Sequence, residues 1–73
     1  MARSNITADI TGTVWKIETQ VGADLACDDP IMIVESMKME IPIVAMDAGQ
    51  VIEILVKEGD PVAEGQAVAI MEI

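Results

Sequence analysis

The stretch Ile31-Met32-Ile33-Val34-Glu35-Ser36-Met37-Lys38-Met39-Glu40-Ile41-Pro42-Ile43-Val44-Ala45 decides the fold of this chain. Apolar runs rich in β-branched residues lie on both sides of the hexapeptide 35–40, which is the pattern of two strands joined by a tight turn. Tight hairpin turns usually contain Asn, Asp or Gly, because their central residues often need a positive φ. Met37 and Lys38 stand there instead. We therefore predict a hairpin at 35–40 whose turn presents the Lys38 amine rather than maximising turn stability.

The length and composition exclude several classes of function. At 73 residues the chain is one small domain, without the length for a catalytic cleft. It has no histidine, which removes the commonest general base and the usual partner of a Ser or Cys nucleophile. Cys27 is the only cysteine, so an internal disulfide and the usual zinc sites are excluded. We expect no catalytic residues, no metal site and a buried or half-buried Cys27.

The net charge and the apolar runs indicate the cellular location of the protein and the classes of partner that it does not bind. Four Lys and Arg stand against thirteen Asp and Glu, and the net charge of −9 disfavours nucleic acid and anionic membrane surfaces. The longest apolar run without proline, residues 67–71, is far too short to span a membrane. Residues 1–7 lack the apolar segment of a signal peptide. We predict a cytoplasmic, free-standing domain with no membrane association.

An internal repeat appears at an offset of 37 residues, which is the separation of Gly12 and Gly49. Glycines and apolar residues coincide at this offset without a gap: Ile6 with Ile43, Ala8 with Ala45, Gly12 with Gly49, Val14 with Val51, Ile17 with Ile54, Gly22 with Gly59, Ala26 with Ala63, and Ile33 with Ile70. Such agreement indicates two copies of one supersecondary unit. We place the copies at about 6–36 and 43–73, related by a pseudo-two-fold axis, with the hairpin 35–40 between them.

Each copy has the pattern of β structure. The predicted strands cover residues 6–8, 13–19, 31–36, 41–45, 50–56 and 67–72, and no stretch shows helical spacing. A sandwich or flattened barrel would let both copies bury their apolar faces together. The predicted core is Val14, Ile17, Leu25, Ile33, Ile43, Val51, Ile54, Val62 and Ile70. The pseudo-two-fold places Lys38 at the end of the molecule opposite the two termini.

The hexapeptide Glu35-Ser36-Met37-Lys38-Met39-Glu40 resembles the biotin attachment motif of biotinyl domains, which is Glu, a small residue and Met-Lys-Met. The resemblance extends over nearly the whole chain, because Gly22, Pro42, Gly49 and the turns at 58–60 and 64–66 fall where biotinyl and lipoyl domains have such residues. It implies one biotinyl domain over residues 1–73. The implied fold is all-β, a flattened barrel or sandwich of two four-stranded antiparallel sheets (a barrel-sandwich hybrid). The sequence departs from the family at Asp28-Asp29-Pro30, where a glycine-containing turn is usual.

The resemblance implies a non-catalytic carrier. A biotin protein ligase would join biotin to Lys38, and the domain would carry a carboxyl group between a biotin carboxylase and a carboxyltransferase. Met37 and Met39 would be recognised by the ligase, with Glu35, Ser36 and Glu40 completing the motif. The amine is flanked in sequence by the neutral side chains of Met37 and Met39, and attachment needs such an unhindered amine.

Two alternatives remain open. A lipoyl carrier with lipoate on Lys38 has the same fold, but lipoyl domains typically have Asp before the lysine and Ala after it. An unmodified β module could instead dock a basic partner through its acidic surface, and Lys38→Arg would then change nothing.

Overall fold

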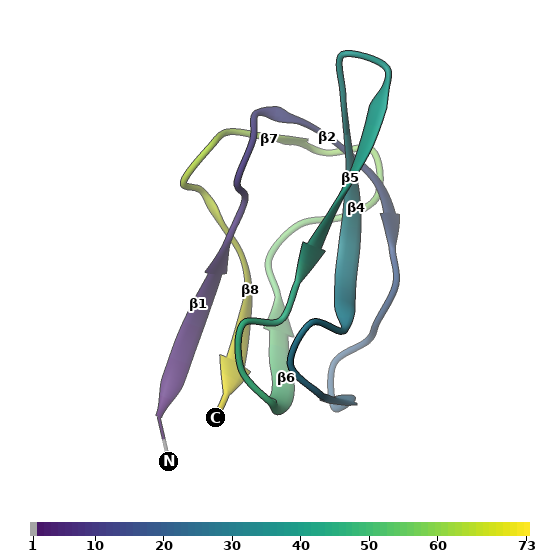
Figure 1. Ribbon diagram of the computed structural model, residues 1–73. Helices are drawn as coiled ribbons and strands as arrows, with labels where there is room; N and C mark the ends of the chain where they lie inside the picture. The colour runs from purple at the N-terminus through teal and green to yellow at the C-terminus, as the bar shows by residue number, and fades with distance from the viewer. Residues whose placement is uncertain (1) are drawn as a thin grey trace.

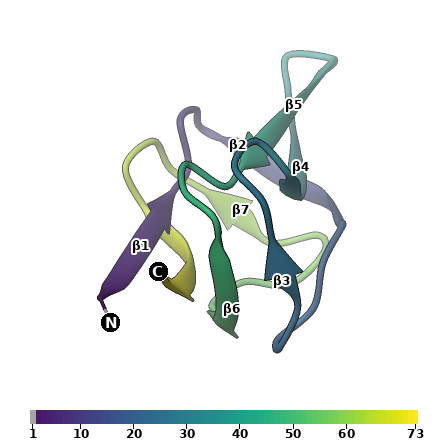
Figure 2. The same cartoon turned by 60° about the horizontal axis from the view of Figure 1, so that its bottom comes forward.

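The computed structural model describes residues 2–73, which form eight strands in two four-stranded antiparallel sheets. One sheet has the order β1 (Arg3–Thr7), β8 (Ala67–Glu72), β6 (Gly49–Ile54) and β3 (Asp24–Leu25). The other has the order β5 (Met39–Val44), β4 (Pro30–Ser36), β2 (Gly12–Ile17) and β7 (Pro61–Val62). The sheets wrap around a common interior (Figures 1 and 2), which confirms the predicted fold class. Residues 2–73 contain no helix with the length and apolar character needed to cross a bilayer.

The strand limits differ from the sequence-based limits in two ways. β1 begins at Arg3 rather than at residue 6, and β2 and β6 end at Ile17 and Ile54. After these ends the chain turns toward Gly22 and Gly59, which have φ values of 94° and 93°. β3 and β7 were not predicted, because strands of two residues are too short to show an alternating pattern.

Backbone hydrogen bonds recur at positions 37 residues apart. The Gly22 amide donates to the Val51 carbonyl at 2.7 Å. The Gly59 amide donates to the Val14 carbonyl at the same distance. Each sheet contains two strands from each predicted copy, so neither copy forms a sheet alone. These hydrogen bonds relate the same pairs of positions that the sequence repeat relates.

The core consists of buried side chains from both sheets. Its members are Ile6, Ala8, Val14, Ile31, Met32, Val34, Ile43, Ala45, Val51, Val56, Val62, Val68, Ala69 and Met71. The predictions for Val14, Ile43, Val51 and Val62 are confirmed. Ile17, Leu25 and Ile54 are partly buried and pack against the core. This shared interior fixes the two sheets relative to each other and gives the hairpin a firm base.

The prediction that Ile33 and Ile70 belong to the core is wrong. Ile33 is only half-buried, whereas Met32 and Val34 on either side of it are fully buried. Ile70 is half-buried between buried neighbours in β8. The β4–β5 register shifts between Pro30 and Met32, and bulges of this kind change the alternation of side chains between the two faces. As a result, Ile31 and Met32 are both buried and the next outward position falls on Ile33.

The turn at Asp28-Asp29-Pro30 has the geometry of its glycine-containing counterpart. Asp28 has φ 73° and Gly65 has φ 86°. The Asp29 carboxylate accepts a hydrogen bond from the backbone amide three residues earlier at 2.9 Å, and the Gln66 side-chain oxygen does the same at 3.0 Å. Asp tolerates the left-handed region, so the departure from the family sequence leaves this turn unchanged.

The same turn exposes Cys27, so the expectation of a buried or half-buried cysteine is wrong. Its Sγ donates to the Met46 carbonyl at 3.2 Å. The side chain lies on the surface because the segment from β3 to β4 runs outside the core.

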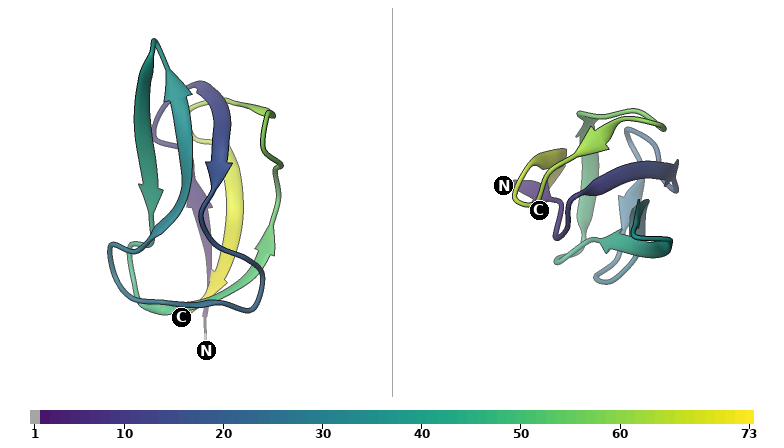
Figure 3. Two further views of the ribbon diagram at one scale, coloured as in Figure 1. Left: turned by 90° about the vertical axis from the view of Figure 1, so that its right-hand side faces the viewer. Right: turned by 90° about the horizontal axis from the view of Figure 1, so that it is seen from above.

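The β4–β5 hairpin and the chain ends lie at opposite ends of an elongated molecule (Figures 1 and 3). The principal extents are 36 × 17 × 17 Å. Near the chain ends, Ala2 and Ile73 exchange two backbone hydrogen bonds of 3.0 and 2.8 Å. The body therefore presents the hairpin tip, with Lys38, at the end opposite the termini, as the repeat predicted.

Candidate functional site

The hairpin tip is built from two residues in the left-handed region. Ser36 and Met39 pair across the ladder, and Met37 and Lys38 between them have φ values of 51° and 66°. Positive φ at both central positions is characteristic of type I′ turns, which favour Asn-Gly. For residues with a β-carbon this conformation costs on the order of 1–3 kcal/mol each. The backbone at Met37 and Lys38 is therefore strained, whereas Asn-Gly at the same positions would adopt this turn with less strain.

The side chains at the tip point into solvent. Met37 is 91% exposed and Met39 is 62% exposed, and Lys38 is exposed between them. Methionines more often fill gaps in cores, so two exposed methionines are unusual. Among residues 2–73, the side-chain hydrogen bonds do not involve Lys38. The amine is thus open to a reactant approaching from outside.

Two carboxylates lie at the base of the tip. Glu35 and Glu40 pair directly across the β4–β5 ladder, and both are exposed. Like charges directly opposite each other destabilise a sheet, although salt screens exposed groups. The pair gives the hairpin an anionic base below the Lys38 tip.

Ser36 faces the body of the domain and is half-buried. Its hydroxyl donates to the Thr11 carbonyl at 2.8 Å. The Thr11 hydroxyl in turn accepts a hydrogen bond from the Glu64 amide at 3.1 Å. Thr11 is not among the site residues predicted from the sequence. The repeat carries no signal for it, because every Ser and Thr of the chain lies in residues 4–36 and none has a hydroxyl counterpart in the second copy.

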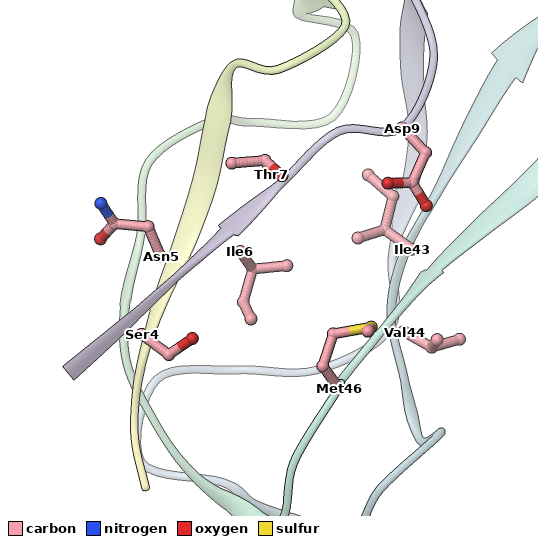
Figure 4. Close-up of a pocket in the computed structure, with 8 residues that line it drawn as sticks. All are labelled: Ser4, Asn5, Ile6, Thr7, Asp9, Ile43, Val44 and Met46. Carbon is pink, nitrogen blue, oxygen red and sulfur yellow. The ribbon is translucent and has the colours of Figure 1, made fainter. Parts of the chain in front are cut away.

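A groove of about 200 Å³ lies elsewhere, between β1 and β5 (Figure 4). Ile6 and Ile43 form part of its wall, with Asp9 and Met46 also lining it. The six predicted site residues do not line this groove. The structure therefore gathers these residues on a projecting hairpin rather than in a pocket, an arrangement suited to carrying an attached group to other proteins.

Comparison with known proteins supports this interpretation. The family model described as "Biotin-requiring enzyme" matches residues 2–71. A biotin/lipoyl attachment protein of Bacillus subtilis is 43% identical over 60 residues, which is 82% of this chain and 82% of that protein. Pyruvate carboxylase of Aspergillus niger is 41% identical over 63 residues, 86% of this chain.

Solved structures agree with the sequence comparison. The urea carboxylase of Kluyveromyces lactis superposes on 99% of this chain with a TM-score of 0.93 and 33% identity. The chain spans only 5% of the pyruvate carboxylase and 6% of the urea carboxylase, so it corresponds to one domain of those proteins. The chain belongs to the biotin/lipoyl attachment family of biotin-requiring enzymes, and it is a carrier domain rather than a catalytic one.

Proposed function

We propose that Lys38 is the biotin attachment residue and that the chain is a biotin carboxyl carrier. The observation that carries this proposal is the projecting, strained tip in which an exposed Lys38 stands between two exposed methionines. A hairpin turn that served only to join two strands would favour Asn-Gly at positions 37 and 38.

The residues at the tip fit a group attached through an amide. Attachment requires an unhindered primary amine, and the exposed Lys38 supplies one on a long flexible stem. In a ligase active site, the Lys38 ammonium first loses one proton to become a nucleophilic amine. Its nitrogen then forms a bond to the activated carboxyl carbon of biotin, the activating group leaves that carbon, and the nitrogen loses a second proton. The amide has no charge, so the formal net charge changes from −9 to about −10. Met37 and Met39 offer the ligase neutral, apolar contacts on either side of the amine.

The partners follow from the carrier role. A biotin protein ligase modifies Lys38, and a biotin carboxylase and a carboxyltransferase then use the loaded domain. Similarity to parts of a pyruvate carboxylase and a urea carboxylase supports a place in such a system. When attached to Lys38, biotin supplies the group that carries carboxyl. The domain contributes a rigid body and a tether, which raise the effective concentration of the carried group at each active site.

In vitro modification tests this proposal. The purified full chain is incubated with biotin protein ligase, biotin and ATP, and the product is examined by streptavidin blot and intact mass. The wild type and the matched controls Lys16→Arg and Lys57→Arg should gain one biotin, and Lys38→Arg should gain none. Labelling of Lys38→Arg would refute the assignment. A protein that accepts lipoate from a lipoate ligase, and never biotin, would be a lipoyl carrier.

A further inference from the structure

Ser36 ties the projecting hairpin to the body. Its hydroxyl donates to the carbonyl of Thr11, a residue 25 positions away in the loop between β1 and β2. The bond length of 2.8 Å is typical of a well-formed hydroxyl hydrogen bond. It is made one residue before the strained turn, where it limits movement of the tip relative to the body.

Thr11 is itself held in place. Its hydroxyl accepts from the Glu64 amide at 3.1 Å. The turn that contains Glu64 is fixed to the body, because the next residue, Gly65, donates its amide to the Ala8 carbonyl at 2.8 Å. We call Ser36, Thr11 and Glu64, with the two hydrogen bonds that join them, the collar. The collar connects the hairpin to two further loops at the same end of the molecule.

The opposite end lacks the side chains that make the collar. The positions that correspond to Ser36 and Thr11 are Ile73 and Ala48, which have no hydroxyl to donate or accept. Other hydrogen bonds of the repeat are present at both ends, including those of Gly22 and Gly59. Other side-chain hydrogen bonds also occur in one copy only, such as that from the Lys57 amide to the Asp60 carboxylate, so asymmetry alone assigns no role to the collar. What distinguishes the collar is its place, because Ser36 lies directly before the turn that presents Lys38.

We propose that Ser36 is a positioning residue, which holds the hairpin in the orientation that biotin protein ligase binds, with Thr11 as its anchor. This inference rests on the proposed function. The β2–β4 ladder ends at Glu35, so only the tip beyond it is a two-stranded hairpin. Such hairpins are marginally stable by themselves, and a tip without the tie therefore samples more orientations. The ligase binds only those molecules whose hairpin is in the competent orientation. The apparent affinity of the ligase for the domain falls in proportion to the fraction of such molecules, while the rate of the chemical step is unchanged. The loss of one exposed hydrogen bond corresponds to roughly a two- to five-fold rise in KM.

Steady-state kinetics of biotin protein ligase test the inference, with the full chain as the varied substrate. Ser36→Ala should raise KM for the domain about two- to five-fold with kcat unchanged. Ser36→Thr keeps the hydroxyl and should restore KM toward the wild-type value. Thr11→Val keeps the carbonyl acceptor but removes the Glu64 contact, so it should raise KM by a smaller factor. Ser4→Ala is the matched control, because Ser4 is also half-buried in a strand and its hydroxyl is absent from the hydrogen bonds described for residues 2–73.

Nuclear magnetic resonance supplies a readout that does not depend on biotin. Backbone order parameters at residues 37–39 should fall in Ser36→Ala and stay at the wild-type value in Ser4→Ala. Equal KM values for Ser36→Ala and Ser4→Ala, or an effect confined to kcat, would overturn the positioning role. Failure of Ser36→Thr to restore KM would also overturn it. A wild type that accepts no biotin would refute the proposed function instead, and unchanged order parameters in Ser36→Ala would then refute the tie separately.

Discussion

Replacing Met37-Lys38 with Asn-Gly should make the domain more stable while removing its attachment site. Both residues lie in the left-handed region, with φ values of 51° and 66°. Asn tolerates this region and Gly occupies it without strain. The substitution also sacrifices little packing, because Met37 is 91% exposed and Lys38 is exposed.

The expected gain follows from two opposing terms. Relief of strain contributes on the order of 1 kcal/mol or more at each position. The greater freedom of glycine in the unfolded chain costs about 0.5–1 kcal/mol. The net increase in the free energy of unfolding is about 1–2 kcal/mol for the double variant, which corresponds to a rise in Tm of roughly 4–16 °C for a domain of this size.

Urea and thermal unfolding followed by circular dichroism measure this change. Lys57→Gly is a suitable control, since Lys57 is an exposed lysine outside the positive-φ residues and should lose stability on substitution. A double variant less stable than the wild type would show that the backbone at Met37-Lys38 is not strained, and it would refute the idea that stability is sacrificed there to present Lys38.

Three further outcomes follow from the packing. Gly12→Ala and Gly49→Ala should each lower the free energy of unfolding, measured in urea, by about 2–3 kcal/mol, because the added β-carbon would collide with a carbonyl oxygen of β4 or β8 respectively. A large difference between the two losses would contradict the equivalence of the two glycines. Met32→Ala should lower the free energy of unfolding by about 2–5 kcal/mol and Ile33→Ala by about 1 kcal/mol, since only Met32 is fully buried. Equal losses would contradict the assignment of Met32 to the inner face of β4 and Ile33 to its outer face. Gly65→Ala should lose about 1 kcal/mol, because Gly65 has φ 86° with open space around it, and a neutral result would show that the turn relaxes.

The sequence was sufficient to predict the fold class because the repeat and the strand-like runs agree. It was insufficient for the faces of β4 and β8. Residues 31–34 are all apolar, so no polar side chain marks the outward position. The bulges that set this position depend on pairing with neighbouring strands, which leaves no local signal. The same cause misplaced both Ile33 and Ile70, because they occupy equivalent positions in the two copies.

The candidate site was predictable in part. The motif identified the exposed hairpin and its lysine, and the repeat placed them opposite the termini. Thr11 was missed because its contacts join segments 25 and 53 residues apart. Comparison of the two copies could not have identified it either, because every Ser and Thr of the chain lies in residues 4–36 and none has a hydroxyl counterpart.

Peptide mapping by mass spectrometry of the protein purified from its own organism shows directly whether Lys38 carries biotin. We expect one biotin per chain on the peptide that contains Lys38, with Lys16 and Lys57 unmodified. A lipoyl group on Lys38, biotin on another lysine, or an unmodified Lys38 in cells that contain an active biotin protein ligase would contradict this expectation.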